Sequence, residues 1–411
     1  MTERLYYHDA YLAEFRAAVV DTAGDGRRVY LDRSAFYPAS GGQPSDLGSI
    51  DGVPVTEVID EQDRIAHVLA SPLEASEVTG RIDWARRHDH MQQHSGQHLL
   101  SAALVELYGA PTLGFHLGAE SSTIDAGAPG LEAGQLAAIE RRVNQLVFEN
   151  RPITVSFEDA VAAAGLRKPS DREGELRVVS ICDYDRSACG GTHVRATGEI
   201  GPVLIRKLDK IRGNVRIEFL CGMRAVRRAR ADYDALAQIS RALAAQPDET
   251  PKLVTASLER LSQTEKALKK LATELAVIRG RDLCAATQPD TDGLRRHFRR
   301  LASGSLDDEL RATAQGFTAG ARAAFVVVID SPPSLMVAVS KDAGLHAGNI
   351  VKEAVAAHGG RGGGSPTVAQ GSVADAAALD RVVEKLAGTL LHADVSKQSW
   401  RRATCTGLDE S

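Results

Sequence analysis

The sequence has no run of 18 or more consecutive apolar residues, and its first residues, Met1-Thr-Glu-Arg-Leu-Tyr-Tyr-His, carry acid and tyrosine where a signal peptide is apolar. The first absence argues against a membrane-spanning helix, and the second argues against a secretory leader. Internal repeats and low-complexity tails are also absent. We therefore expect a globular protein of the cytoplasm.

Cysteine is scarce, and the five cysteines are Cys182, Cys189, Cys221, Cys284 and Cys405. An odd number without regular spacing does not fit a disulfide framework. In a reducing compartment, a cysteine with a function is more often a metal ligand or a nucleophile than half of a bridge. We expect four of the five to be small core residues and Cys189 to have a chemical role.

An excess of positive charge is missing too, because 49 Lys and Arg stand against 54 Asp and Glu, for a net charge of −5. This balance argues against a wholly basic nucleic-acid-binding protein, but local basic patches are enough for contact with phosphates. The length of 411 residues favours two or three domains.

The chain has the pattern of an α+β protein with four successive parts. Short apolar-polar runs punctuated by Gly, Pro and Asp predict a small β-barrel over residues 1–80. Residues 81–222 predict an α+β domain, with helices over about 90–108 and 131–149. Residues 223–285 predict a helical arm, and residues 286–411 predict an α/β domain that ends in a helix over 374–391.

The arm has leucines and other apolar residues at spacings of three, four and seven, interrupted by the stretch 246–251. This pattern predicts two antiparallel helices that act as a spacer. The heptads are too few to distinguish an amphipathic arm from a dimerising coiled coil, so a homodimer through the arm or the C-terminal domain stays open.

Two histidines, His94 and His98, are four residues apart at the start of a predicted helix. Residues at this spacing share one helix face, so both imidazoles can reach one metal ion. The same spacing occurs in the HExxH motif of zinc proteases, where the residue after the first His is a catalytic Glu. Here that residue is Ser95, which disfavours a protease of that type.

A second ligand pair is Cys189-Gly-Gly-Thr-His193, in which the double glycine predicts a tight turn. His94, His98, Cys189 and His193 form a donor set that suits zinc. Four protein ligands would close a tetrahedral, structural site, whereas catalysis needs an open position or a loose ligand. His193 is the candidate for the loose ligand.

These motifs together resemble a family. HxxxH followed by CGGTH resembles the editing domain of alanyl-tRNA synthetase and the free-standing AlaX trans-editing proteins, and the segment from Phe36 to Gly48 resembles the family's glycine-rich motif. The stretch from Lys341 to Gly371 resembles the DHHA1 domain at the synthetase C-terminus. We find no class II aminoacylation domain before them in this sequence and therefore expect no charging of tRNA, which matches the long form of AlaX.

The resemblance implies a deacylase that hydrolyses the ester of Ser-tRNA(Ala) and of Gly-tRNA(Ala), with Zn2+ held by His94, His98, Cys189 and His193. Of these, it makes His94, His98 and Cys189 the catalytic residues. Its substrate pocket would include Ser34, Gly41, Gly42 and Gln43. The simpler alternative is turn stabilisation, in which Gly41 and Gly42 permit a positive φ and Gln43 is simply exposed. Ser34 departs from the family, which often has Thr at this position. Whether zinc activates water or only positions the substrate stays open.

Contact with tRNA is expected at three basic clusters and at the glycine tract near residue 360. The residues we assign to tRNA binding are Lys207, Lys210, Arg212, Arg216, Gly360, Arg361, Gly362 and Gly363. The other two clusters are at 224–230 and 295–300. Each cluster taken alone fits an ordinary solvated face, and the glycines also fit a flexible loop after a helix.

Three rival functions remain. One is a non-catalytic tRNA-binding protein with a structural zinc. A phosphodiesterase would need a DHH motif, whereas the nearest run is His88-Asp-His90. A peptidyl-tRNA hydrolase is suggested only by the tripeptide Gly41-Gly-Gln43.

Overall fold

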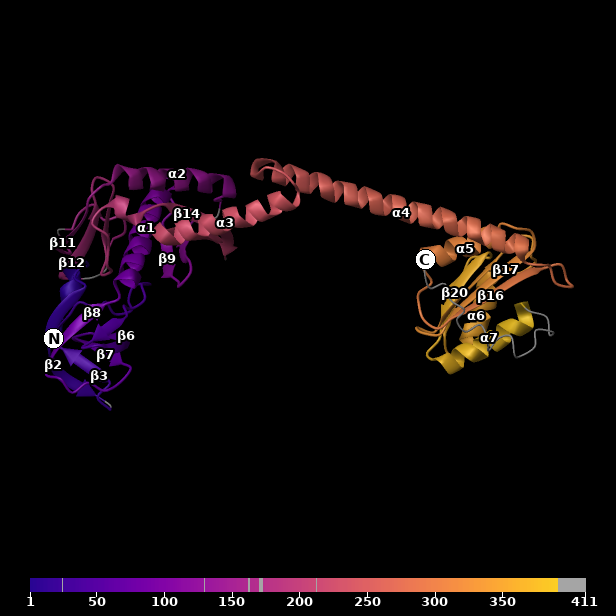
Figure 1. Cartoon of the computed structure of the whole chain (residues 1–411), viewed down its shortest axis with the longest axis horizontal. Coiled ribbons are helices and arrows are strands. Elements are labelled where there is room, and N and C mark those ends of the chain that lie inside the picture. The colour runs from indigo at the N-terminus through magenta and orange to yellow at the C-terminus, as the bar shows by residue number, and fades with distance from the viewer. Residues whose placement is uncertain (24, 129, 162, 170–172, 212, 391–411) are drawn as a thin grey trace. The chain divides into compact units, whose positions relative to one another are not determined.

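The computed structural model describes residues 1–23, 25–128, 130–161, 163–169, 173–211 and 213–390. By internal contacts the chain divides into two compact units, Met1–Pro247 and Asp248–Ser411 (Figure 1). The α+β class expected from the sequence is confirmed. Within the described residues, no helix is long and apolar enough to cross a membrane.

The first unit begins with a closed barrel of six strands in the order β2-β3-β7-β6-β5-β8. Their bounds are β2 (Glu14–Ala23), β3 (Arg28–Leu31), β5 (Gly48–Ile50), β6 (Val53–Glu61), β7 (Arg64–Leu69) and β8 (Glu77–Ile82). Alternate residues of the strands point inward, and Val29, Leu31, Ile50 and Ile65 are fully buried there. The short strands β1 (Glu3–Arg4) and β4 (Arg33–Ser34) pair in parallel beside the barrel.

A long helix, α1 (Trp84–Tyr108), follows the barrel and is buried over most of its length. It begins six residues before the predicted start because the Asp83 side chain accepts a hydrogen bond from the Arg86 N–H and caps the helix. Gly109 ends it in the left-handed conformation, at φ 59°. The helix therefore forms the centre of the second half of this unit.

Two sheets and a second helix surround α1. The four-stranded sheet has the order β14-β15-β10-β9 and the three-stranded sheet the order β11-β12-β13. The bounds are β9 (Thr112–Leu117), β10 (Ser122–Ala126), α2 (Ala133–Glu149), β11 (Ile153–Asp159), β12 (Glu175–Ile181), β13 (Asp185–Ala188), β14 (Val203–Ile211) and β15 (Asn214–Cys221). One apolar core joins these elements, with Leu99, Leu100, Ile139, Val179 and Ile217 among its buried residues.

The predicted arm consists of α3 (Gly222–Ala242) and α4 (Thr250–Ala286). The boundary after Pro247 assigns α3 to the first unit and α4 to the second. The apolar stripe of α4 is exposed in the single chain: Leu258, Leu261, Leu268, Leu271, Leu275 and Ile278 are 47–67% accessible. Whether a second copy covers this stripe stays a prediction.

The second unit is a five-stranded sheet in the order β16-β17-β18-β20-β19, with helices on both faces. Its elements are β16 (Arg295–Leu301), α5 (Asp308–Thr318), β17 (Ala323–Ile329), β18 (Ser334–Val339), α6 (Ala347–Ala356), β19 (Arg361–Gly364), β20 (Val368–Ser372) and α7 (Ala376–Leu390). Every residue of β17 is buried, because α5 covers one face of the sheet and α6 with α7 covers the other.

The glycine tract is an edge strand and not a flexible loop. β19 pairs antiparallel with β20, and α6 packs closely on it. A Cβ on Gly362 would lie 2.8 Å from the Gln370 carbonyl oxygen, and one on Gly364 would lie 2.3 Å from the Val368 carbonyl oxygen. The alternative of a flexible loop is therefore wrong. Glycine is needed at these positions because a side chain would clash with the neighbouring strand, and not because the backbone must be mobile.

Candidate metal centre

The four predicted ligands come together between α1 and the segment that follows β13. His94 and His98 lie one turn apart on α1, Cys189 directly follows β13, and His193 lies four residues later. One ligand atom from each of the four residues lies within 4.8 Å of every other, and among the described residues no other such group is found. The fold thus brings two pairs of candidate ligands that are far apart in the sequence to one face of α1.

The donor atoms face a common point. Cys189 Sγ lies 3.4 Å from His94 Nε2 and 3.3 Å from His193 Nε2. The three imidazoles are buried to 5% exposure or less. One thiol and three imidazoles are ligands that zinc accepts in a tetrahedral arrangement, so the residues present fit the ion.

Each imidazole is held from behind through Nδ1. His94 Nδ1 lies 2.8 Å from Gln43 Oε1, and because that oxygen only accepts, Nδ1 carries the hydrogen. His193 Nδ1 lies 3.1 Å from Ser95 Oγ. His98 Nδ1 lies 3.4 Å from Asp185 Oδ2, a longer contact. Partners of this kind fix the ring orientation and leave Nε2 for the metal.

The site favours the protonation states that a metal requires. Burial lowers the pKa of His94 to about 3 and holds the pKa of His193 well below its ordinary value. Burial alone would raise the pKa of the Cys189 thiol, but the hydrogen bond from His98 and the Gly191 N–H outweigh it, so this pKa is lowered. Neutral imidazoles and a thiolate are the ligand forms.

The glycines of the CGGTH motif are required by this packing. A Cβ on Gly191 would lie 2.2 Å from His94 Cε1. Arg177, which sequence reasoning did not single out for this role, donates to the carbonyl oxygens of Cys189 at 2.7 Å and Gly191 at 2.9 Å. The turn is thus held by a half-buried guanidinium from β12.

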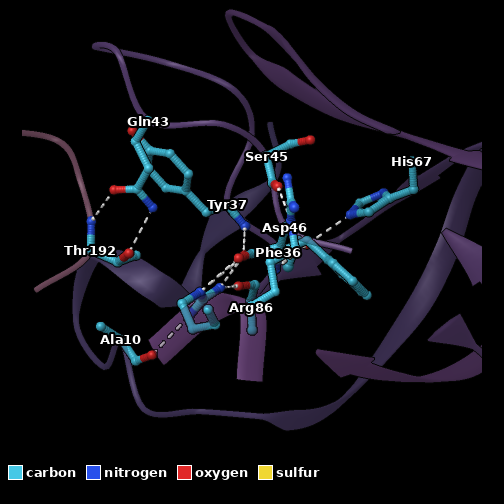
Figure 2. A network of polar contacts seen from close by, with 12 residues as sticks. Ala10, Phe36, Tyr37, Gln43, Ser45, Asp46, His67, Arg86 and Thr192 are labelled. Atoms are coloured by element: carbon cyan, nitrogen blue, oxygen red, sulfur yellow. Dashed lines mark hydrogen bonds and ion pairs between the residues drawn. The ribbon is translucent and has the colours of Figure 1, made fainter. Parts of the chain in front are cut away.

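The glycine-rich loop after β4 is fixed to α1 by a buried ion pair. Asp46 and Arg87 are both inaccessible to solvent and are joined directly. Asp46 Oδ2 also accepts from the Tyr37 N–H at 2.6 Å, and Arg86 donates to the Ser45 carbonyl oxygen at 3.0 Å (Figure 2). Arg87 lies seven residues before His94, so the loop rests on the helix that carries two ligands.

This loop places Gln43 against the ligand segment. Gln43 Nε2 donates to Thr192 Oγ1 at 2.8 Å, and its Oε1 accepts from the Thr192 N–H at 3.2 Å. Figure 2 shows the side chain directed at Thr192. Both the nitrogen and the oxygen of the Gln43 amide thus bind Thr192, which lies between the candidate ligands Cys189 and His193. Gly41 and Gly42 have φ of 56° and 84°, which makes the turn possible.

Ser34 lies elsewhere, inside the barrel region. It is inaccessible, its Oγ lies 2.7 Å from His67 Nε2, and it accepts from the Phe36 N–H at 3.1 Å. His67 Nδ1 in turn lies 3.1 Å from the Val29 carbonyl oxygen. Ser34 is therefore satisfied by the protein and is not part of the pocket beside the ligands.

A pocket of about 360 Å3 opens beside the four-residue cluster. Its lining includes Gly41, His94, His98 and Cys189, the β9 residues Thr112, Leu113, Gly114 and Phe115, and the loop residues Arg167, Lys168 and Pro169. A larger hollow of about 610 Å3 in the second unit, beside Cys284, contains no group of potential metal ligands. The pocket at the cluster is therefore the candidate active site.

The other cysteines and the basic clusters differ partly from expectation. Cys221 and Cys284 are buried, but Cys182 is exposed, so the expectation of a core role is wrong for Cys182, whereas Cys405 lies outside the described residues.

In the basic clusters, Lys207 pairs with Asp209 and Arg216 with Asp125. Arg296 and Arg300 are also paired with carboxylates.

Among the residues assigned to tRNA binding, Lys210 has no ion pair with the residues that the structure describes, and Arg212 lies outside them. Gly360, Arg361, Gly362 and Gly363 lie at or beside the edge strand β19. The expected cationic surface is thus partly neutralised by neighbouring acids.

Two family models match the chain. The model described as the threonyl and alanyl tRNA synthetase second additional domain matches residues 176–218, and the DHHA1 domain matches residues 307–391. The first match contains all of β12 except its first residue, the whole of β13, and two of the clustered residues, Cys189 and His193.

Similar proteins cover most of the chain. An alanine–tRNA ligase of Pyrococcus abyssi is 32% identical over 94% of this chain and 43% of its own length. The chain thus spans under half of the ligases it matches. The alanyl-tRNA editing protein AlaX-L of Pyrococcus horikoshii is 33% identical over 68% of this chain and 71% of its own. Aarsd1-B of Xenopus laevis, an alanyl-tRNA editing protein, is 35% identical over 68% and 69%. With relatives so similar over most of their length and the metal-ligand cluster of the motif assembled, the chain belongs to the alanyl-tRNA editing protein family.

Proposed function

We propose that the protein is a zinc-dependent deacylase that hydrolyses the ester between a wrong amino acid and the terminal ribose of tRNA(Ala). The observation that carries this proposal is the cluster of His94, His98, Cys189 and His193 beside a pocket, in a chain of the editing family. Action on charged tRNA fits a cytoplasmic protein. We propose Ser-tRNA(Ala) as the main substrate and Gly-tRNA(Ala) as the second.

The chain's own residues hold and orient the reacting groups. His94, His98 and Cys189 hold the ion, and Gln43 keeps His94 in the orientation that presents Nε2. When bound, zinc supplies a Lewis acid for ester hydrolysis, acting on water or on the substrate's amino group. His193 is the ligand whose release would open a position, because its Nδ1 contact with Ser95 Oγ, at 3.1 Å, is longer than the 2.8 Å contact of His94 with Gln43 and, unlike that of His98, involves no carboxylate.

Selectivity has a physical basis in the pocket. An apolar synthetase site rejects serine, which is alanine with an added hydroxyl, only about 100-fold. A second site that hydrogen-bonds this hydroxyl disfavours alanine, because alanine leaves the polar groups unpaired. We propose that the turn at Gly41 and Gly42, beside Gln43, shapes this part of the pocket, and that Ser34 acts only through the packing of the loop.

The test is incubation of the protein with alanine tRNA charged with serine, glycine or alanine. We expect release of serine and glycine, with the alanine ester largely spared. Equal rates on the serine and alanine esters would refute the selective pocket.

A second function is favoured by one observation: four protein donors are close enough to fill a tetrahedral site. A tRNA-binding protein with a structural zinc would show full metal content and tRNA affinity but no hydrolysis of any of the three esters. The same assay, combined with elemental analysis, therefore separates the two functions.

A further inference from the structure

The pocket beside the candidate metal centre is lined by basic side chains but by no carboxylate. Its lining contains Arg167 and Lys168 and no Asp or Glu. Both cations lie on the connection between β11 and β12, whereas four other residues of the lining, Thr112 to Phe115, belong to β9. The pocket thus combines metal ligands, an apolar strand and a cationic rim.

Arg167 is engaged by the protein. Its Nε lies 2.7 Å from Asp185 Oδ1 and its Nη2 donates to Ser187 Oγ at 2.8 Å. The Arg167 N–H also donates to the Arg186 carbonyl oxygen at 2.8 Å. These bonds join the connecting segment to β13, the strand that leads into Cys189. Arg167 is therefore an anchor, and its charge is offset by Asp185.

Lys168 differs from its neighbour. Its side chain is exposed, and it forms no ion pair with any residue that the structure describes. Because Arg167 fixes the backbone beside it, Lys168 is held at the rim of the pocket that contains His98 and Cys189. An anchored ammonium group that pairs with none of the described carboxylates, in a pocket whose lining contains no Asp or Glu, is suited to an anion.

We infer that Lys168 binds the phosphate of the terminal nucleotide of the substrate RNA. This inference rests on the proposed function, because an ester on the terminal ribose places that nucleotide's own 5′-phosphate a few bonds from the reacting carbonyl. The ligand class is therefore a 3′-aminoacylated nucleotide with a 5′-phosphodiester. Lys168 contributes to binding and takes no part in bond breaking.

The test compares three serine esters with the same reacting bond: 3′-O-seryladenosine, its 5′-monophosphate, and a serylated minihelix of tRNA(Ala). The variant Lys168→Ala should raise KM about tenfold for the two substrates that carry the phosphate. It should leave KM for 3′-O-seryladenosine and kcat for all three unchanged. Lys168→Arg should restore binding, and Arg16→Ala, which removes an exposed cation from barrel strand β2, is the matched control.

Three results would overturn the inference: no change in any KM, an equal rise for all three esters, or a rise for the minihelix alone, which would move the contact to another phosphate. Salt dependence of binding to the uncharged minihelix gives an answer independent of hydrolysis. Lys168→Ala should reduce the slope of log K against log salt by about 0.7, and an unchanged slope contradicts the assignment. Failure of the unaltered protein to hydrolyse any ester counts instead against the proposed function.

Discussion

At the scale of single residues, the candidate centre depends on two side chains from each of two distant segments. Cys189 supplies the only sulfur of the cluster, and its loss leaves three imidazoles. We expect Cys189→Ala to lose zinc, as measured by elemental analysis of the purified protein. Cys182→Ala, at an exposed cysteine outside the cluster, is the control and should keep the metal. Full zinc occupancy in the first variant would disprove the ligand assignment.

Gln43 tests the role of the groups behind the ligands. Because its Oε1 accepts from both His94 Nδ1 and the Thr192 N–H, Gln43→Ala frees the His94 ring to rotate. Removal of such a partner commonly costs about 10–100-fold in metal affinity, and competition with a chelator measures this. Gln62→Ala, at an exposed turn of the barrel, is a matched control. Unchanged affinity would mean that packing alone orients His94.

His67 links the barrel interior to pH. Burial lowers its pKa to about 4 from the ordinary 6.5. Between these values the unfolded chain binds the proton and the folded one does not, so the free energy of unfolding falls as the pH falls from 6.5 towards 4. The contribution of His67 to this fall in the free energy of unfolding approaches about 1.4 kcal/mol per pH unit. Denaturant unfolding of His67→Gln should show a shallower pH dependence in this window; an identical dependence would contradict the assignment.

At the scale of elements, the sheet edge of the second unit offers a matched pair of substitutions. Gly362→Ala places a Cβ 2.8 Å from the Gln370 carbonyl oxygen, whereas a Cβ at Gly363 meets nothing within 4 Å. We expect the first variant to lose about 1–3 kcal/mol of unfolding free energy and the second to change little. Thermal denaturation compares them, and equal losses would refute the close packing of β20 and of Val351 of α6 on Gly362.

Elements also decide how the ligand pairs meet. α1 carries His94 and His98 on one face, and its capping by Asp83 extends it to Arg87, where the glycine-rich loop is fixed through Asp46. β13 brings Cys189 to the same place. The centre is thus held by contacts between elements and not by the sequence neighbours of the ligands.

At the scale of the whole molecule, all four clustered residues and the pocket lie in the unit Met1–Pro247. A protein truncated after Pro247 should therefore keep zinc and hydrolyse the ester at high enzyme concentration. We expect its tRNA affinity to be weaker and less salt-dependent, because each lost phosphate contact reduces the slope. Binding as tight as that of the full chain would assign the second unit another task, such as dimerisation, which sedimentation would reveal.

The sequence by itself determined the candidate ligands, the i, i+4 histidine pair on one helix, the succession of β-rich and helical segments and the family, because these depend on local spacing and on short motifs. Tertiary structure alone decided which distant groups stand behind the ligands. Asp185 and Arg177 lie far along the chain from α1, and no local pattern marks a residue that acts through space.

The same distinction explains the corrections. A run of glycines predicts a flexible backbone. In β19, however, β20 and α6 pack so closely on Gly362 that a Cβ would not fit there. Ser34 lies two residues before the glycine-rich motif that contains Gln43, yet its hydroxyl contacts His67 of the barrel, whereas the Gln43 side chain contacts His94 of α1. Ser34 and Gln43 lie at different sites because their hydrogen-bond partners come from different elements, and only the folded chain brings those partners into contact.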